Sequence, residues 1–156
     1  MKVAILTAST EVYRKQEEDK SGAVIRQLVE EAGLQVVFAQ AVPLDRKVLS
    51  TIMQRLSDGQ VADLILTTGG AGCGPEDCTP EATTDIIEKS ILGIPEAMRM
   101  HMMQLTKRSM LNRGTAGIRG KSLIVNLPGK AGAVKECLGY LLPELVHGVE
   151  VIKGEA

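Results

Sequence analysis

The chain has 156 residues, which fits one domain over residues 1–156 that is large enough to bury a core. Its 18 basic and 19 acidic side chains nearly cancel and it has no tryptophan, so neither a broad positive field nor base stacking favours a nucleic-acid partner. Three cysteines and an apolar N-terminal run that ends at Thr7 argue against a disulfide framework, a signal peptide and a membrane span, so we expect a cytoplasmic protein with no membrane partner that binds a small molecule.

Short apolar runs alternate with amphipathic segments along the first half of the chain. The runs predict buried strands, and apolar residues at helical spacing predict helices, as with Leu28 and Val29 before a capping Gly33. The predicted order is strand 3–6, helix 21–33, strand 36–39, helix 48–59 and strand 62–68. A glycine-rich segment follows, and beyond it Thr79 is predicted as the N-cap of a helix with Pro80 in its first turn.

The second half of the chain continues the alternation. A helix is predicted over residues 94–107, a buried strand over residues 123–127, and a final helix over residues 134–149 that Pro143 should kink or divide. Strands that alternate with helices indicate a mainly parallel sheet with helices on both faces. We therefore expect an α/β protein, a three-layer α/β/α sandwich with a mainly parallel sheet.

The glycine-rich segment, residues 67–81, is the first candidate site. Its glycines permit positive φ and close approach of a ligand to the backbone, beyond the carboxyl ends of the strands. Asp77 would place a carboxylate beside a bound phosphate, which suggests Mg²⁺. The segment lacks the Gly-Lys-Ser/Thr ending of a P-loop, and Pro75 stands where a dinucleotide fingerprint needs its third glycine. Glycine content alone leaves a structural turn equally open.

Several motifs in a fixed order carry a resemblance over nearly the whole chain. They are Asp19-Lys-Ser-Gly22, Thr67-Thr-Gly-Gly-Ala-Gly72, Thr79-Pro-Glu-Ala82, Ala116-Gly-Ile-Arg-Gly120 and Asn126-Leu-Pro-Gly129. Together with Asp77 they resemble the signature of the MogA/MoaB family of molybdenum cofactor biosynthesis, the molybdopterin adenylyltransferases that include the gephyrin G domain. Each motif alone is weak, whereas their shared order is specific.

The resemblance implies an activity, its ligands and a set of site residues. The family transfers AMP from Mg-ATP to the terminal phosphate of molybdopterin and releases pyrophosphate, so Mg²⁺ is the implied cofactor and Asp77 the metal-linked catalytic acid. The implied nucleotide and pterin contacts are Thr68, Gly69, Gly70, Ala71, Gly72, Thr79, Glu81, Asn126, Pro128 and Gly129, with Asp19, Lys20 and Ser21 near the pterin. The resemblance also implies a homotrimer and a downstream protein that inserts molybdate.

The sequence departs from the family pattern at four positions. Leu44 stands where the family has an aspartate after proline, and Asp45 follows one residue late. Asp45 is a candidate second catalytic acid and equally a candidate helix N-cap. Glu76 replaces the arginine before the loop aspartate and brings a repelling charge. Ala71 stands where the family has the third threonine of its glycine-rich motif, and Asn112 stands where the family has the serine of a Leu-Ser-Arg segment.

These departures bear on turnover more than on fold, and they keep other functions open. One alternative is a catalytically weak or inactive protein that binds molybdopterin or assists assembly. Another is a nucleotide-binding domain of a different pathway.

Other side chains have simpler interpretations. Cys73 and Cys78 lack a second ligand pair, so they are interpreted as free thiols rather than a zinc site. The methionine-rich helix over residues 98–110 is interpreted as a subunit interface, although methionine is also common filler in an aliphatic core. Arg113, Arg119 and Lys130 are interpreted either as phosphate contacts or as ordinary surface cations.

Overall fold

The computed structural model describes residues 1–156 and places six strands in one sheet. The strands are β1 (Lys2–Ala8), β2 (Gln35–Val42), β3 (Leu64–Thr68), β4 (Lys89–Ser90), β5 (Ala116–Arg119) and β6 (Ser122–Leu127). They lie in the order β2-β1-β3-β6-β5-β4. The first four of these are parallel, and β5 is antiparallel to both β4 and β6.

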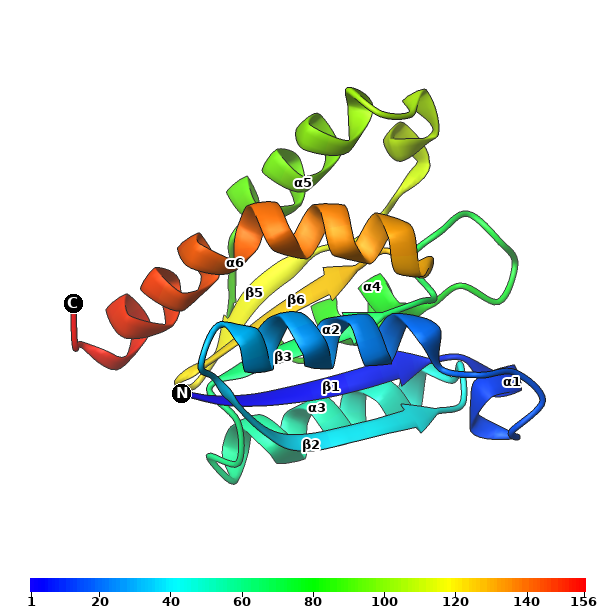
Figure 1. Cartoon of the computed structure of the whole chain (residues 1–156). Coiled ribbons are helices and arrows are strands. Elements are labelled where there is room, and N and C mark those ends of the chain that lie inside the picture. Colours follow the sequence, from blue (N-terminus) through cyan, green and yellow to red (C-terminus); the bar gives the residue numbers. More distant parts are fainter.

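Helices cover both faces of this sheet. They are α1 (Thr10–Tyr13), α2 (Lys20–Glu31), α3 (Arg46–Asp58), α4 (Thr79–Thr84), α5 (Gly93–Met103), the 3-10 helix η1 (Lys107–Leu111) and α6 (Ala131–Lys153). Helices α2, α5 and α6 pack on one face, and α3 and α4 on the other (Figure 1). The predicted α/β sandwich with a mainly parallel sheet is confirmed. No helix combines the length and apolar character needed to cross a membrane.

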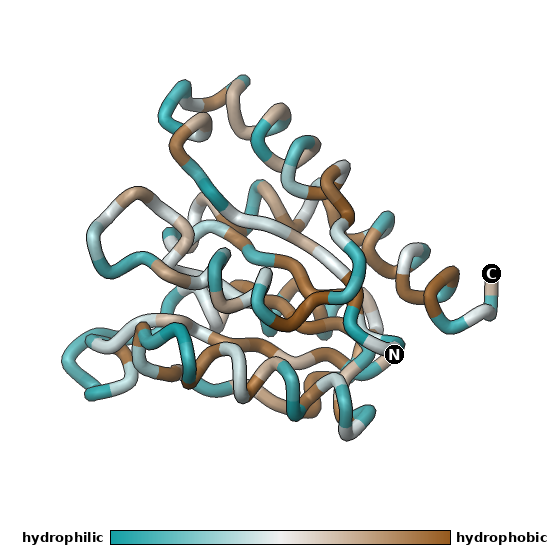
Figure 2. The backbone as a smooth tube through the Cα atoms, turned by 180° about the vertical axis from the view of Figure 1, so that it is seen from behind, coloured by the Kyte–Doolittle hydropathy of each residue, from teal (hydrophilic) through white to brown (hydrophobic).

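Successive residues of the central strands supply two separate cores. In β1, Val3 and Ile5 pack toward α2 and α6, whereas Ala4 and Leu6 pack toward α3, and all four are at most 1% exposed. Side chains alternate between the faces of a strand, so a strand covered on both faces is apolar at every position. Figure 2 shows apolar colour along the central strands and mixed colour along the covering helices.

Two helix boundaries differ from the sequence-based prediction. Cys78, not Thr79, occupies the N-cap position of α4, and Thr79 is its first helical residue. The N–H of Thr79 instead donates to the Gly70 carbonyl oxygen and its hydroxyl to the Gly69 carbonyl oxygen. Pro80 lies in the first turn as expected. Helix α5 ends at Met103 rather than near residue 107, because η1 follows as a separate turn.

Other elements were missed or proved longer than predicted. Helix α6 runs through Pro143 undivided, and its axis changes direction near the middle (Figure 1), which is the kink that the sequence allowed. Short helix α1 and strands β4 and β5 had no sequence-based prediction. Strand β5 pairs antiparallel with β6, so the sheet is mixed at one edge.

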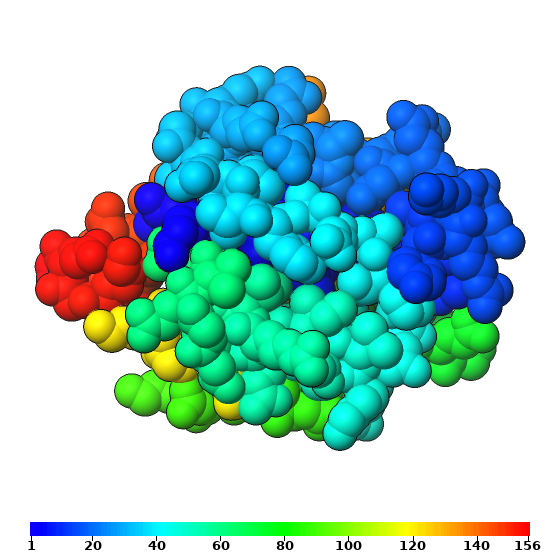
Figure 3. Space-filling model, turned by 90° about the horizontal axis from the view of Figure 1, so that it is seen from below, coloured from blue at the N-terminus to red at the C-terminus, as the bar shows by residue number.

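The carboxyl ends of β1, β3 and β6 lie at one edge of the sheet (Figure 1). Strands β2 and β3 flank β1 on opposite sides. The chain therefore leaves β1 toward one side of the sheet, where β2 lies, and leaves β3 toward the other side, where β4, β5 and β6 lie. Such a topological switch point is where open α/β sheets bind ligands. Figure 3 shows the segment after β1, coloured blue, at the end of the molecule opposite the red C-terminus. The candidate site is therefore expected at the end of the molecule that carries the segment after β1.

Candidate functional site

The ends of three strands hold the start of the glycine loop, defined here as residues 69–78. The hydroxyl of Thr68, the last residue of β3, donates to the Pro128 carbonyl oxygen after β6 at 2.6 Å. Gly69 has φ +89°, and a Cβ at this position would lie 2.6 Å from the Ala8 carbonyl oxygen at the end of β1. Only glycine fits where the three strand ends approach so closely.

The far end of the loop is fastened by Thr79. Its hydroxyl donates to the Gly69 carbonyl oxygen at 2.9 Å, and its N–H donates to the Gly70 carbonyl oxygen at 3.0 Å. Gly70 also has a positive φ of +70°. The buried Thr79 therefore fixes the loop from inside the protein, so its hydroxyl contacts the loop backbone.

Asp77 folds back into the loop. Its Oδ2 accepts from the Gly74 N–H at 2.8 Å, and the Asp77 N–H donates to the Gly74 carbonyl oxygen at 3.1 Å. A Cβ at Gly72 would lie 2.9 Å from Oδ2, so the missing side chain makes room for the carboxylate. No protein group donates to Oδ1. One carboxylate oxygen is thus fixed and the other remains available.

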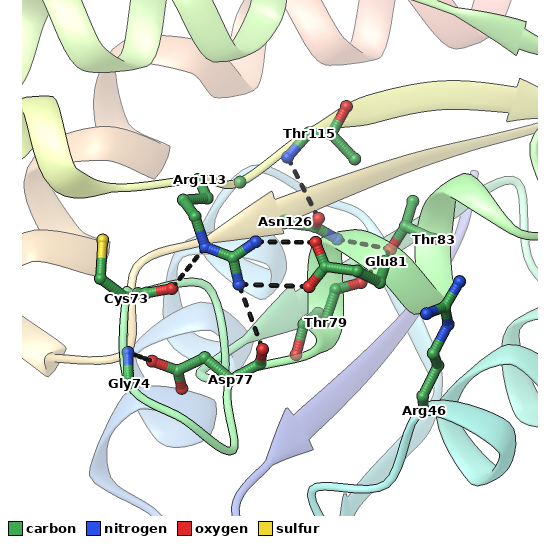
Figure 4. A network of polar contacts seen from close by, with 12 residues as sticks. Arg46, Cys73, Gly74, Asp77, Thr79, Glu81, Thr83, Arg113, Thr115 and Asn126 are labelled. Atoms are coloured by element: carbon green, nitrogen blue, oxygen red, sulfur yellow. Dashed lines mark hydrogen bonds and ion pairs between the residues drawn. The ribbon is translucent and has the colours of Figure 1, made fainter.

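The side chain of Arg113 forms hydrogen bonds with the glycine loop and with Glu81 (Figure 4). Its Nε donates to the Gly72 carbonyl oxygen at 2.6 Å, and its Nη2 donates to the Asp77 carbonyl oxygen at 3.1 Å. Its two terminal nitrogens donate to the Glu81 carboxylate at 2.7 and 3.1 Å. These hydrogen bonds lower the pKa of Glu81 below its usual value. Glu81, expected to contact the ligand, contacts Arg113.

Asn126 differs from its expected role as a wall of the site. The side chain is 1% exposed, and its Nδ2 donates to the hydroxyls of Thr67 at 3.0 Å and Thr83 at 2.9 Å. Its Oδ1 accepts from the Thr115 N–H at 3.1 Å. The amide joins β6 to β3, α4 and the start of β5, and it lines neither of the two cavities at this edge of the sheet.

Two cavities open beside the loop and meet at Gly129 and Lys130. The first, about 290 Å³, is lined by Thr7, Ala8, Ser9, Val12, Glu17, Glu18, Lys20, Ser21, Thr68, Gly69, Gly129, Lys130 and Ala131. The second, about 460 Å³, is lined by Gly72, Cys73, Met102, Thr106, Arg108, Ser109, Leu111, Asn112, Pro128, Gly129, Lys130 and Ala133. The structure thus gathers Lys20, Ser21, the loop and the segment after β6 around one divided space.

Asp19 and Asp45 act as helix N-caps. The Asp19 carboxylate accepts from the Gly22 N–H at 2.9 Å and from the Thr7 hydroxyl at 2.8 Å, which ties α2 to the end of β1. Asp45 is exposed, and its Oδ1 accepts from the Val48 N–H at 2.9 Å. Of the two interpretations of Asp45, the structure shows the helix N-cap.

Leu44 faces the glycine loop in place of an acid. Its Cδ1 lies 2.5 Å from the point where a Cβ on Gly70 would stand. Ala71 is 5% exposed, and its carbonyl oxygen accepts from the Arg113 N–H at 2.7 Å. Glu76 is exposed at the loop tip. Asp77 is therefore the one loop carboxylate that the protein fixes while leaving one of its oxygens free of protein donors.

The cysteines form no metal site. Cys73, Cys78 and Cys137 are all free thiols, and no group of three or more His, Cys, Asp or Glu side chains is placed to hold a metal ion. Cys73 is exposed and donates to the Leu111 carbonyl oxygen at 3.2 Å. Burial raises the pKa of Cys137 to about 12, so this thiol stays protonated.

Comparisons with known proteins identify the family. A family model described as a probable molybdopterin binding domain matches residues 4–147. The molybdopterin adenylyltransferase of Helicobacter pylori (strain ATCC 700392 / 26695) is 35% identical over 154 residues, which cover 97% of this chain and 88% of that protein. The chain belongs to the MogA/MoaB family of molybdenum cofactor biosynthesis proteins.

Solved structures agree with this assignment. The molybdopterin biosynthesis enzyme MoaB of Thermus thermophilus has a TM-score of 0.92 at 35% identity, and the match covers 98% of this chain and 96% of that one. The molybdopterin biosynthesis Mog protein of Mycobacterium ulcerans has a TM-score of 0.87 at 32% identity, with coverage of 97% and 98%. The resemblance carried by the ordered motifs is thereby confirmed.

Proposed function

We propose that the protein transfers AMP from Mg-ATP to the terminal phosphate of molybdopterin. The observation that carries the proposal is the glycine loop: the N–H groups of residues 69–73 donate to no protein acceptor, and Asp77 lies beside them. Backbone N–H groups without a protein acceptor at this edge of the sheet suit phosphate. The Helicobacter pylori relative is a molybdopterin adenylyltransferase, which supports the same reaction.

The reaction asks little proton transfer of the protein. A phosphate oxygen of molybdopterin attacks the α-phosphorus of ATP, the bond to the β-phosphate oxygen breaks, and pyrophosphate leaves. Since the nucleophile is already anionic, catalysis depends on alignment and on neutralising phosphate charge. Lys130 borders both cavities and Lys20 borders the first, and α6 begins at Ala131 with its N-terminal N–H groups toward this edge. We propose that the product passes to a molybdate-insertion protein.

Asp77 fits Mg²⁺ that arrives with ATP better than it fits a resident metal. Mg²⁺ is usually held by one or two carboxylates together with substrate phosphates and waters. Oδ1 of Asp77 is free for that purpose, and the Gly74 N–H fixes the carboxylate. Bound Mg²⁺ would supply charge neutralisation on the phosphates. The contribution of the chain is the orientation of Asp77.

A direct assay tests the proposed reaction. Purified protein with molybdopterin and Mg-ATP should yield adenylyl-molybdopterin and pyrophosphate in equal amounts, and omission of molybdopterin should abolish pyrophosphate release. Absence of product at enzyme concentrations equal to the substrate would reject AMP transfer.

A molybdopterin-binding or assembly protein with weak or no catalysis is the second candidate. Leu44 favours it, because an apolar side chain lies against Gly70 where the family pattern has an acid. The negative charge of Glu76 at the loop tip also favours it. This candidate predicts tight pterin binding without AMP transfer.

The Leu44→Asp variant distinguishes the two candidates. A carboxylate beside Gly70 would give the Mg²⁺ of ATP a second oxygen ligand, so we expect kcat to rise by about tenfold or more. Leu44→Asn is the matched control, since it has similar size without the charge and should give no such gain. Steady-state assays of pyrophosphate release measure both variants. If the wild type is active and Leu44→Asp is slower than it, Leu44 does not limit catalysis.

We also propose a homotrimer assembled through an apolar surface on α5 and η1, called the α5 surface here. Its exposed members are Leu92, Met100, Met103, Leu105, Met110 and Leu111. Tyr140 of α6 is also exposed and stacks on His101 of α5, with the ring centroids 4.2 Å apart. Met100 is 71% exposed, and a large exposed apolar patch is typical of a protein interface. Of the methionine-rich segment, Met100, Met103 and Met110 lie on this surface, whereas Met98 and Met102 are core residues.

Charge on the α5 surface should dissociate the assembly. We expect the double variant Met100→Glu, Met110→Glu to sediment as a monomer where the wild type sediments as a trimer, because two buried carboxylates per subunit oppose association. Val61→Glu is the control, since Val61 is exposed but lies between α3 and β3. A monomeric wild type at micromolar concentration would contradict the proposal.

A further inference from the structure

Arg113 contacts three peptide groups in and beside the glycine loop. The orientation of these groups decides whether a bound phosphate faces N–H groups or carbonyl oxygens. Its side chain holds the carbonyl oxygens of Gly72 and Asp77, and its own N–H holds the carbonyl oxygen of Ala71. Figure 4 shows the guanidinium between the loop and Glu81. Arg113 is therefore placed to set the direction of loop peptide groups.

Peptide geometry gives the consequence. In a planar trans peptide, the C=O of one residue and the N–H of the next point in opposite directions. Because Arg113 binds the Gly72 carbonyl oxygen, the Cys73 N–H points away from Arg113, and the same holds for the Gly72 N–H after Ala71. Neither N–H has a protein acceptor, and both residues line the second cavity.

We propose that Arg113 is a positioning residue for phosphate binding, which turns loop carbonyl oxygens outward so that the Gly72 and Cys73 N–H groups face the phosphate. This inference rests on the proposed function in taking a nucleotide phosphate as the ligand. A reversed peptide would present a carbonyl oxygen, which repels phosphate oxygens, in place of a donor. Arg113 itself does not contact the reacting atoms.

The planar guanidinium is what allows one side chain to hold several acceptors. Arg113 reaches the Gly72 and Asp77 carbonyl oxygens while both of its terminal nitrogens bind the Glu81 carboxylate. A lysine ammonium is a compact charge that cannot reproduce this fork. Through the bidentate ion pair, Arg113 also neutralises the Glu81 carboxylate close to the phosphate site.

Two variants separate peptide orientation from charge neutralisation. Arg113→Lys keeps the positive charge but loses the fork, whereas Glu81→Gln removes the ion pair and leaves Arg113 free to bind both carbonyl oxygens. Arg119→Lys is the matched control. Arg119 likewise forms a bidentate pair, with Asp58 at 2.9 and 3.0 Å, and donates to the Ile86 carbonyl oxygen at 2.8 Å, but it does not touch the loop.

The experiment measures binding of Mg-ATP by calorimetry and the amide resonances of Gly72 and Cys73 by NMR. In the wild type both resonances should shift on addition of Mg-ATP. We expect Arg113→Lys to raise Kd by about tenfold or more and to suppress these shifts, since charge-assisted hydrogen bonds fix the loop. Glu81→Gln and Arg119→Lys should stay within about threefold of the wild-type Kd.

Three results would overturn the inference: wild-type protein that binds no Mg-ATP, Arg113→Lys with wild-type affinity and shifts, or Glu81→Gln as damaging as Arg113→Lys. The last would assign the effect to the ion pair between Arg113 and Glu81 rather than to the contacts with the loop carbonyl oxygens. Failure of the proposed function looks different, because wild-type protein would then bind Mg-ATP with these shifts and still form no adenylyl-molybdopterin. Conversely, AMP transfer that survives Arg113→Lys unchanged rejects the inference alone.

Discussion

Replacing Asp77 with asparagine is expected to lower kcat/KM for AMP transfer by about a hundredfold to a thousandfold, the usual loss when a main electrostatic group is removed from a phosphate or oxyanion site. Asparagine keeps an oxygen that can accept from the Gly74 N–H, so the turn that closes the loop tip should persist. What it loses is the negative charge on the free oxygen. The effect should therefore appear in turnover while the thermal unfolding midpoint changes little.

The neighbouring acid supplies the control for this prediction. Glu76→Gln removes one negative charge from the same loop, but Glu76 is exposed and carries no hydrogen bond in the structure. Its kcat/KM should stay the same or rise, because a charge that repels phosphate is removed. Rates of pyrophosphate release measure both variants. Equal losses in the two variants, or an Asp77→Asn variant with about a third of wild-type activity, would contradict a specific role for Asp77.

The central strands were predictable because their signal is local. Strands β1 and β6 are buried on both faces, so each produces an apolar run that the sequence displays directly. Strand β4 consists of two exposed residues, and β5 of four residues that are buried or half-buried and include Gly117 and Arg119. Their existence depends on pairing with each other and with β6. The pairing of β4 with β5 joins residues distant in the chain, such as Lys89 and Ile118, so no local pattern announces it. Strand β5 instead forms a hairpin with β6 across Gly120 and Lys121, and its four residues are too few to show a strand pattern.

The candidate site divides in the same way. Gly69 and Gly70 were recognisable as positions that permit positive φ, and both adopt it. The sequence offered Asp45 as a candidate N-cap, whereas the Asp19 cap was not predicted, although Asp19 also precedes an amphipathic helix. The contact between Glu81 and Arg113 joins residues 32 positions apart, and its sequence signal is only two opposite charges. Nothing local distinguishes that pair from surface charges.

Asn126→Ala is expected to lower the free energy of unfolding by about 3–4 kcal/mol, the largest stability effect that the site offers. Alanine removes the hydrogen bonds to Thr67, Thr83 and Thr115, each contributing about 1 kcal/mol, and leaves the Thr115 N–H without its partner. Urea unfolding at fixed protein concentration measures the change. Ser122→Ala on the same strand is the control, because it loses a single hydrogen bond, to the Ala62 carbonyl oxygen, and should cost about 1 kcal/mol.

The same variant decides between two roles for Asn126. The motif places this residue among the expected ligand contacts, whereas the structure uses every polar atom of its side chain inside the protein. If the structural role is the correct one, folded Asn126→Ala protein at low temperature should bind Mg-ATP within about threefold of the wild-type Kd while its unfolding midpoint falls by roughly 6–12 °C. A loss of affinity without a loss of stability would instead make Asn126 a ligand contact. The Asn126 amide links β6 to β3 and α4, the two elements that flank the glycine loop. Asn126 can therefore belong to a binding motif because it supports the loop, without contacting the ligand.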